Sequence, residues 1–511
     1  MEKEKRNYRF YALMNLFNFS MVGLFFSPNL FQTYLFWEII GVVSYLLIGF
    51  EYNKSEKSLA SKKVFIMNRI GDTALIAGII ICSYFIYLYA PNKALATLSF
   101  VDMNTISTII YAYASNPLFE IICGLFILAA LVKSAQFPFY TWLQDAMEAK
   151  LPVSSLLHSA TLVAAGIFLT LRLLPFYTLE PVLLKAIAIL GVLTALICSI
   201  SAIAQDKPKK VLAYSTSAQL GLVYFAIGAL NIKASLVLFV AHAIIKSVLF
   251  ILLPRENEKW NYVKFVLFLV SGLSLSGLIL SGMVAKELFA TSLGNVGTII
   301  VSVLSFLTAF YIIRIALRLF ETQGVEKVRP KTLELISAIG LLALNIVFYI
   351  YLHLTCKYSV AEPFWAALTA WICVYILYLK SAFWKVPVLY PIAKNGFYLD
   401  KFYMSVCAKI YSGFANFCNF VDTKLLANYK PVLASAKGAV RFASFIEEKI
   451  MNGALKTLVK MFRKISYIDL RAQDGSIQRY NTYAFIIITL ILVCLIFGYI
   501  TVLVYIGGIN G

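Results

Sequence analysis

Apolar residues along this chain gather in long, continuous runs of about 20 residues, separated by short segments that carry most of the charges. A membrane-spanning helix needs about 20 mainly apolar residues, whereas a spanning β-strand alternates between apolar and polar positions. The pattern therefore predicts an all-α polytopic membrane protein with about thirteen transmembrane helices. The predicted spans lie near residues 8–27, 30–50, 66–90, 117–135, 152–175, 181–204, 211–230, 233–253, 262–283, 294–320, 333–355, 362–380 and 483–507.

Composition agrees with a membrane protein. Hydrophobic residues make up 61% of the 511 residues and charged residues only 14%, and the mean hydropathy is +0.81. An average soluble domain is about 45–50% apolar and about 25% charged, so a soluble enzyme, a disordered chain and a fibrous repeat are excluded. The formal net charge of +20 is better explained by basic loops on the cytoplasmic side than by nucleic-acid binding.

The loop charges predict an orientation. If Met1 is inside, the inner short loops are rich in lysine and arginine and the outer loops are poor in both, which predicts a cytoplasmic N-terminus and an external C-terminus in the inner (plasma) membrane. The inner positions are Lys54, Lys57, Lys62, Lys63, Lys207, Lys209, Lys210, Arg255, Lys259, Lys327, Arg329 and Lys331, against Lys93, Lys233, Lys286 and Lys357 outside.

The segment 384–480 has a different pattern, in which apolar residues recur every three or four positions and lysines fall mostly off that stripe. We interpret it as an amphipathic helix along the cytoplasmic membrane surface, with a break near Pro431. The alternative is a soluble cytoplasmic domain. The stripe consists of Tyr403, Val406, Ile410, Phe414, Phe417, Val421, Leu425, Phe442, Ile446, Ile450, Ala454, Leu458, Met461 and Ile465.

Four regions follow from these patterns. They are a core at 1–320, additional transmembrane helices at 321–383, the amphipathic lateral helix region at 384–482 and a C-terminal anchoring span at 483–511. No GxGxxG or P-loop pattern, no CxxC pair and no histidine cluster is present in the sequence. We therefore expect no cofactor or metal on this chain. The N-terminus lacks a signal-peptide cleavage site.

Several ionisable residues lie within or at the ends of the predicted spans, where a charge costs several kcal/mol unless it is paired or hydrated. Pro138 should break the helix just past Lys133. Three of these groups have a purely structural alternative. Arg69 and Asp72 could form a structural ion pair, His158 could be a core histidine, and Lys286 and Glu287 could form a pair at the membrane interface. The full set of ionisable residues in or at the ends of spans is Glu38, Arg69, Asp72, Lys133, His158, His242, Lys246, Lys286 and Glu287.

These groups predict a chain of proton carriers. Burial makes a lysine release its proton more readily, and a nearby carboxylate reverses that effect. Changing the distance between lysine and carboxylate, or hydrating the site, therefore loads or unloads a proton. Broken helices add hydratable backbone at the same depth.

Six motifs follow one another in the order of a known family. They are WEIIGVVSYLLIGF, NRIGD, KSAQFPFYTWLQDAM, PVSSLLHSATLVAAG, KKVLAYSTSAQLG and AHAIIKS. They resemble the antiporter-like subunits of respiratory complex I, in particular chain L of bacterial NADH-quinone oxidoreductase. The tail motifs NGFYLDKFY and DGSIQRYNTYAF resemble those flanking the lateral helix of chain L.

The resemblance implies two inverted five-helix repeats, each with a broken helix, and a proton pathway through both. It implies that Glu38 and Lys133 are the proton-carrying pair, with Arg69 and Asp72 supporting them. His242 and Lys246 correspond to the family's connecting residues on the central axis. Lys209 corresponds to the basic position before VLAYST, and Lys286 corresponds to the proposed proton outlet. His158 and Glu287 are supporting residues. NADH, FMN, iron–sulfur clusters and quinone would lie on partner chains, and the lateral helix would contact sister membrane chains.

The chain departs from the family in several places. The family usually has three further helices before the first one here. The family's GPT is replaced by Ala149, Lys150 and Leu151, an expected histidine by Leu238, and a longer loop by RENEKW.

The leading hypothesis is a proton-translocating subunit of a redox-driven complex. The alternatives are a subunit of a Na⁺/H⁺ antiporter, of a membrane-bound hydrogenase or of an inorganic-carbon uptake complex, and a purely structural membrane subunit.

Overall fold

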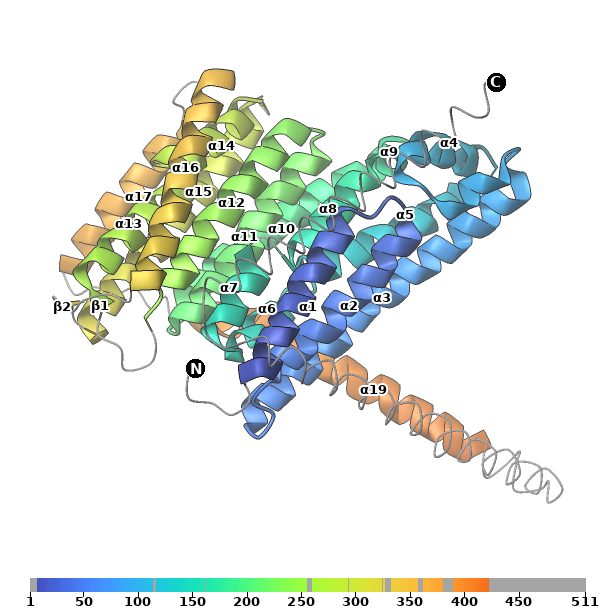
Figure 1. The fold of residues 1–511 in the computed structure, drawn as a ribbon, viewed down its shortest axis with the longest axis horizontal. Coiled ribbons are helices and arrows are strands. Elements are labelled where there is room, and N and C mark those ends of the chain that lie inside the picture. The colour runs from blue at the N-terminus through green and yellow to red at the C-terminus, as the bar shows by residue number, and fades with distance from the viewer. Residues whose placement is uncertain are drawn as a thin grey trace, which may run out of the picture. The chain divides into compact units, whose positions relative to one another are not determined.

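The structure is a computed structural model, and it describes residues 7–113, 116–159, 161–254, 260–292, 294–323, 325–326, 332–356, 362–379 and 389–421. These residues are almost entirely helical (Figure 1). The exceptions are the two-residue strands β1 (Trp260–Asn261) and β2 (Val325–Glu326), which pair in parallel. The main helices of the first part are α1 (Asn7–Phe25), α2 (Leu30–Ile48), α3 (Ser55–Tyr89), α4 (Met103–Tyr113), α5 (Asn116–Lys133), α6 (Thr141–Asp145), α7 (Leu151–Ser159), α8 (Ala164–Arg172) and α9 (Leu174–Thr178).

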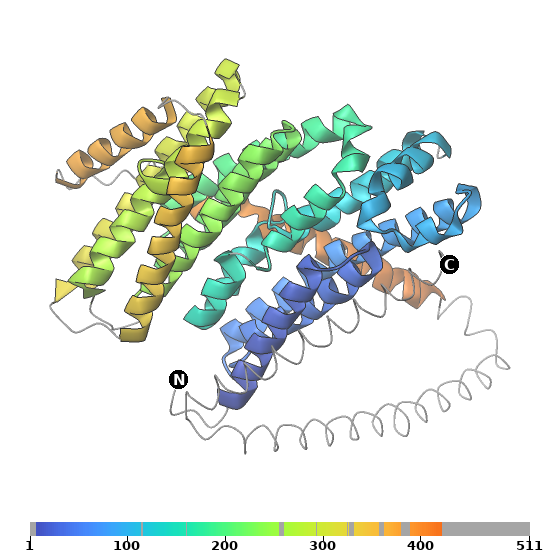
Figure 2. The ribbon, with the colours of Figure 1, turned by 45° about the horizontal axis from the view of Figure 1, so that its top comes forward.

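The second part continues the bundle, and the long helices from α10 to α16 lie side by side with those of the first part in the ribbon views (Figures 1 and 2). Its helices are α10 (Pro181–Ala204), α11 (Pro208–Gly228), α12 (Ile232–Leu252), α13 (Tyr262–Ser276), α14 (Leu280–Ser292), α15 (Gly294–Gln323), α16 (Thr332–Thr355), α17 (Glu362–Leu379), α18 (Leu389–Lys394) and α19 (Leu399–Phe420). Short 3-10 turns at Lys93–Thr97, Phe100–Asp102, Ala146–Glu148 and Gly396–Tyr398 lie in the connections.

Within the described residues, nine helical segments are long and apolar enough to cross a membrane. The chain is thus a polytopic α-helical protein, as the apolar runs predicted. All twelve predicted spans before residue 381 fall on helices. The thirteenth, at 483–507, lies outside the described residues, so the total of about thirteen stays a prediction.

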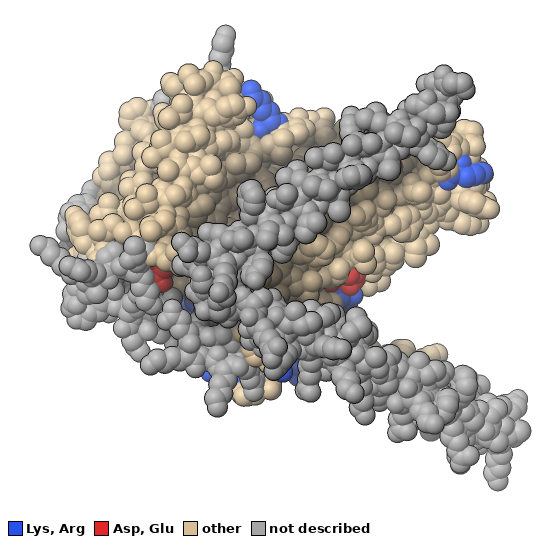
Figure 3. Space-filling model, in the orientation of Figure 1, with Lys and Arg blue, Asp and Glu red and all other residues tan. Residues whose placement is uncertain are grey.

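Charge is sparse on the visible surface of the bundle. In Figure 3 the described face carries few Lys, Arg, Asp or Glu side chains, and those few gather near the upper and lower borders of the bundle. Many of the exposed side chains are large and apolar, such as Phe19, Ile80, Ile189 and Val347. This is the surface that a lipid bilayer requires between its two polar interfaces.

Two helix interruptions within the described residues lie close to predicted site lysines. The first interruption follows Lys133, where α5 ends and residues 134–140 lead into α6. The second follows Ser276, where Gly277 adopts a left-handed conformation (φ 94°) and ends α13 before α14 begins. A break after Lys133 was predicted from Pro138, and a second broken helix carrying Lys286 was implied by the family resemblance. The inverted symmetry of two repeats stays a prediction.

The chain divides into two compact units, residues 1–404 and 405–511. Helix α19 begins in the first unit and continues into the second. Its helical conformation up to Phe420 agrees with the amphipathic pattern predicted for this segment. The rest of the predicted lateral helix, with its break near Pro431, lies outside the described residues, and the four sequence-based regions stay predictions.

Glycines bring helices α10 and α11 into backbone contact. A Cβ atom on Gly221 would lie 2.6 Å from the carbonyl oxygen of Gly191 and 2.9 Å from the amide of Ala195. Close backbone approach through small residues is a common way to pack helices in membranes, where apolar burial supplies little drive. In chain order, these two helices lie between the two interruptions.

We expect Gly221→Val to destabilise the protein by about 1–3 kcal/mol, because the new side chain must push two backbones apart. Gly124→Val on α5 is a matched control, since no atom of a neighbouring helix lies within 4 Å of a Cβ built there. Thermal unfolding of the detergent-purified chain measures both. Equal melting temperatures for the two variants would contradict the close-packing account.

Candidate functional site

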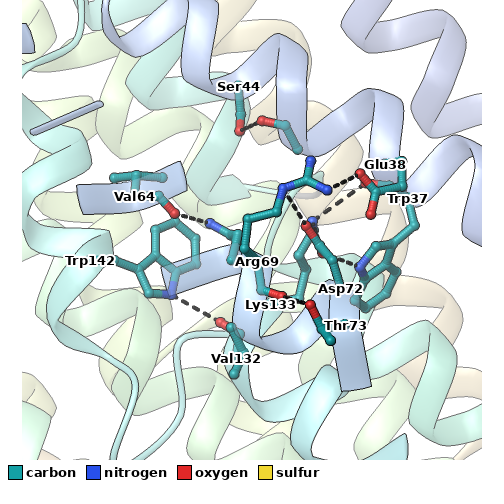
Figure 4. A network of polar contacts seen from close by, with 12 residues as sticks. Trp37, Glu38, Ser44, Val64, Arg69, Asp72, Thr73, Val132, Lys133 and Trp142 are labelled. Carbon is teal, nitrogen blue, oxygen red and sulfur yellow. Dashed lines mark hydrogen bonds and ion pairs between the residues drawn. The ribbon is translucent and has the colours of Figure 1, made fainter. Parts of the chain in front are cut away.

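Four ionisable side chains form a continuous network inside the first half of the bundle (Figure 4). Glu38 comes from α2, Arg69 and Asp72 come from α3, and Lys133 is the last residue of α5. Arg69 and Asp72 are three residues apart, so they project from the same side of their helix. The network contains two carboxylates and two cations and is therefore neutral in its ionised form.

Lys133 is completely buried. Its Nζ lies 3.2 Å from Oδ1 of Asp72 and 3.4 Å from the carbonyl oxygen of Trp37, and it lies 4.9 Å from the centre of the Trp37 ring. The same carboxylate oxygen of Asp72 also accepts a hydrogen bond of 2.7 Å from Nε1 of Trp37. Gly41 lies beside this pair, since a Cβ there would be in ordinary contact with the lysine nitrogen at 3.4 Å and with Oδ2 of Asp72 at 3.7 Å. The ammonium group is thus matched by a carboxylate, a carbonyl dipole and an aromatic face.

Glu38 reaches this lysine only through intermediaries. Its Oε2 lies 2.5 Å from Nη1 of Arg69, and Nε of Arg69 lies 3.7 Å from Oδ2 of Asp72. The family resemblance implied Glu38 and Lys133 as the proton-carrying pair. The structure places Arg69 and Asp72 between them, so that Lys133 pairs with Asp72 and Glu38 pairs with Arg69.

The break after Lys133 is held by two side-chain hydrogen bonds, one to a carbonyl at the end of α5 and one to a carbonyl at the start of α8. Nε1 of Trp142 donates to the carbonyl of Val132 at 2.9 Å, and Oγ of Ser134 donates to the carbonyl of Val163 at 2.8 Å. Ala135 has a positive φ of 50°, and Pro138 has no N–H to continue the helix. An interrupted helix inside a membrane needs such partners, because each unsatisfied carbonyl costs several kcal/mol.

A second group of buried titratable residues lies on α7 and α12. His158, His242 and Lys246 are at most 2% exposed. The lysine Nζ donates to the carbonyl oxygen of Leu212 at 3.0 Å, and α7, which carries His158, packs against α12. The His158 ring lies 5.3 Å from the ring of Phe250. His242 and Lys246 were predicted on one helix face, and the structure brings His158 from another helix to the same region.

The third group surrounds the second interruption. Lys286 and Glu287 were predicted at the end of a span at 262–283 or just past it, and that boundary is wrong. The break at Gly277 puts both residues within α14, where Lys286 is 2% exposed and Glu287 is fully buried. The Lys286 Nζ donates to the carbonyl of Ser276 at 3.1 Å, and Oε1 of Glu287 accepts from the amide of Phe364 at 3.1 Å.

Lys209 lies apart from these buried groups, near the start of α11. Its side chain is half-buried, and its Nζ donates to the carbonyl of Ala149 at 3.2 Å. It therefore touches the connection that leads into α7, which carries His158.

The sequence interpretation did not single out Glu51, which lies in the connection between α2 and α3 and pairs with three lysines. Oε2 of Glu51 lies 2.6 Å from Nζ of Lys57 and 3.3 Å from Nζ of Lys54, and its Oε1 lies 3.2 Å from Nζ of Lys150. The hydrogen bond from Lys57 lowers the pKa of Glu51 to about 2 against the opposing effect of burial, with further lowering from the other two lysines. Lys150 also lies over the rings of Phe10 and Phe50.

Asp206, in the connection between α10 and α11, is a second carboxylate that binds several basic side chains and was not predicted from the sequence. It pairs with Arg318 and, at 2.8 Å, with Lys394. Partial burial would raise its pKa, but hydrogen bonds from Lys394 and Arg318 hold that pKa at about 2. A similar bridge joins Lys63 to Asp145 and Asp400. Sequence offers little warning of these pairs, because their members lie up to 337 residues apart.

Among the described residues, no group of three or more His, Cys, Asp and Glu side chains is arranged to hold a metal ion. The expectation that redox cofactors lie on partner chains stays a prediction. The chemistry that the buried side chains offer is proton exchange among lysines, histidines and carboxylates.

Residues 27–318, more than half of the chain, match the transmembrane family described as NADH:quinone oxidoreductase/Mrp antiporter. The chain belongs to this family, which confirms the resemblance to antiporter-like subunits. The chloroplastic NAD(P)H-quinone oxidoreductase subunit 5 of Amborella trichopoda is 42% identical over 252 residues, or 49% of this chain. That of Lemna minor is 42% identical over the same length.

The matched segment spans 33% of each of these two relatives. A solved structure of the Mrp complex from Dietzia sp. DQ12-45-1b aligns with 85% of this chain and 51% of its own chain. The TM-score is 0.66 at 23% sequence identity. This similarity supports the fold of the bundle.

We expect Asp72→Leu to destabilise the protein by about 3–5 kcal/mol, because it leaves the Lys133 ammonium buried without its carboxylate. The double variant Asp72→Leu/Lys133→Met removes both charges and should recover most of this loss. Thermal unfolding in detergent compares the two. If the double variant is no more stable than the single one, the ion pair is not the source of the effect.

We expect Glu51→Gln to lower the melting temperature at neutral pH and to have little effect near pH 2. The folded-state pKa of about 2 lies below the ordinary value of 4.5. The stabilisation from Glu51 is therefore present above about pH 4.5 and is lost as the pH falls through about 2. Glu56→Gln, at an exposed position nearby, is the control. A Glu51→Gln deficit that persists at pH 2 would show a different cause.

Proposed function

We propose that this chain is a proton-translocating membrane subunit of a complex I-like NADH-quinone oxidoreductase. In this proposal, partner chains carry the redox chemistry and this chain carries protons, with no redox centre of its own. The observation that supports it most strongly is the network at a helix break in which the buried Asp72 and Lys133 connect with the partly buried Glu38 and Arg69, in a member of this family. A protein that needed only a scaffold would gain nothing from four charges there.

The network suggests how a proton is held and released. Asp72 faces Lys133 on one side and Arg69 on the other. When Asp72 lies against the lysine, the ammonium form is stabilised. When Asp72 shifts toward Arg69, Lys133 loses its counter-charge and releases its proton. Glu38 competes for the same arginine, so a change at Glu38 is transmitted to Lys133 through two ion pairs.

The remaining buried groups extend the pathway. His158, His242 and Lys246 lie in the middle of the bundle, and Lys286 lies at the second break. Each of these side chains can bind and release one proton, and the broken backbone between them offers hydratable carbonyls. We propose Lys286 as the last carrier before the outer side, with Glu287 beside it.

The contacts of Asp72 favour protons over sodium as the translocated ion. A sodium ion is a hard cation that needs several oxygen ligands. One Asp72 oxygen already accepts from Lys133 and Trp37, and the other lies 3.7 Å from Nε of Arg69 without a hydrogen bond. The positive charges of Lys133 and Arg69 on both sides of this carboxylate disfavour a metal cation there. A role in Na⁺/H⁺ antiport is therefore the weaker proposal.

The location and partners are part of the proposal. We place the chain in the inner (plasma) membrane with a cytoplasmic N-terminus, on the basis of its loop charges. The relatives from chloroplasts are named as subunits of an oxidoreductase, which supports an assembly with other membrane subunits. We propose that the amphipathic segment beginning with α19 contacts sister chains.

We expect Lys133→Ala and Glu38→Ala each to reduce NADH-driven acidification of membrane vesicles carrying the native complex. The fall should be about tenfold or more, since a general acid–base group typically contributes about 10²- to 10⁴-fold. Lys233→Ala, at an exposed position on α12, is the control and should transport normally. Equal amounts of assembled complex are verified by gel electrophoresis. Retained pumping in both variants would overturn the assignment.

A further inference from the structure

An asparagine on α16 joins the two halves of the second broken helix. Asn345 is fully buried in the interior of α16. Its Nδ2 donates to Oγ of Ser274 on α13 at 3.3 Å, and its Oδ1 accepts from Oγ of Ser281 on α14 at 2.5 Å. One side-chain amide therefore binds a hydroxyl before the break and a hydroxyl after it.

The residues of the break are closely packed around this amide. A Cβ on Gly282 would collide with the carbonyl of Ser274, so the start of α14 lies directly against the end of α13. A Cβ on Gly277 would lie 2.9 Å from Cδ of Lys286, so the lysine stem lies along that glycine. The lysine nitrogen then reaches the carbonyl of Ser276, two residues after Ser274. The geometry of the lysine thus depends on the same few residues that Asn345 holds.

A second polar contact aligns α16 with α13. Nζ of Lys264, near the start of α13, lies 2.7 Å from Oε2 of Glu334, near the start of α16. Lys264 precedes Ser274 by ten residues, about 15 Å along a helix, and Glu334 precedes Asn345 by eleven, about 16 Å. The two contacts therefore match in spacing. They attach α16 to α13 at both ends of the same stretch and leave Asn345 aimed at the break.

We propose that Asn345 is a positioning residue that holds the second break in the shape that places Lys286 on the carbonyl of Ser276. The inference rests on the proposed role of Lys286 in proton transfer. A buried amide bound on both sides is costly to leave unsatisfied, so the bonds to Ser274 and Ser281 resist separation of α13 from α14. The amide is therefore a direct connection between α16 and the residues that position the lysine.

The test compares Asn345→Leu with Asn345→Gln in the assembled complex in membrane vesicles. Leucine has nearly the shape of asparagine but no hydrogen-bonding groups, whereas glutamine keeps the amide. We expect Asn345→Leu to reduce proton transport by about tenfold and Asn345→Gln to restore most of it. Hydrogen exchange of backbone amides at residues 273–283, measured by mass spectrometry, should be faster in Asn345→Leu and close to wild type in Asn345→Gln.

Two serines of α13 provide a matched pair of controls. Ser274→Ala removes one of the Asn345 bonds and should give an intermediate loss. Ser271→Ala should have little effect, because Oγ of the equally buried Ser271 bonds to the carbonyl of Leu267 in its own helix. Both variants are measured for transport and for hydrogen exchange at the break.

The outcomes separate this inference from the proposed function. Normal transport and normal exchange in Asn345→Leu overturn the inference, and so does an equal loss in the leucine and glutamine variants. If exchange at the break rises only in the leucine variant but Lys133→Ala and Lys286→Ala still pump protons, the positioning role stands and the proposed function fails. If both lysine variants lose transport while Asn345→Leu keeps it, the function stands and the inference fails.

Discussion

The neutralisation of a lysine ammonium inside an apolar bundle is the constraint on which the rest of this structure depends. Lys133 is fully buried, and an unpaired charge at that depth would cost several kcal/mol or more. Asp72 supplies the counter-charge, Trp37 supplies an aromatic face and a carbonyl, and Arg69 and Glu38 complete a neutral set. Three helices must therefore meet within a few ångströms, which determines how α2, α3 and α5 pack.

The broken helices solve a related problem. A proton carrier in a membrane needs polar surroundings, but a continuous helix hides its backbone groups from them. At the first break Trp142 binds a carbonyl at the end of α5, and Ser134 ties the connecting residues to the start of α8. At the second break Lys286 binds the last carbonyl of α13, and Asn345 binds a serine hydroxyl on each side. Lys133 is the last residue of α5, whereas Lys286 lies within α14 and its Nζ reaches back to the carbonyl of Ser276 at the end of α13. The same side chains that stabilise the interruption thus also set the position of the titratable group.

Outside the apolar interior, carboxylates shared by several basic side chains connect the helix ends. Glu51 binds lysines from the starts of α3 and α7, and Asp206 binds Lys394 and Arg318. The pKa of each carboxyl is about 2, because several cations surround it. These contacts fix the connections between helices whose apolar surfaces face lipid and give little directional packing.

The sequence by itself determined the class of the protein, the positions of twelve predicted spans on helices, the break after Lys133 and the identity of the buried charges. A run of about 20 apolar residues has the length of a bilayer crossing, and a charge within it is too costly to be incidental, so local pattern suffices for both. Only the tertiary structure decided which charges are partners. Asp72 lies between Lys133 and Glu38, Lys286 lies inside α14 because Gly277 ends α13, and Asn345 joins both halves of the second break. Those relations depend on how helices that are distant in the chain face one another. The periodicity of residues along one helix carries no information about which side chain of a neighbouring helix lies opposite.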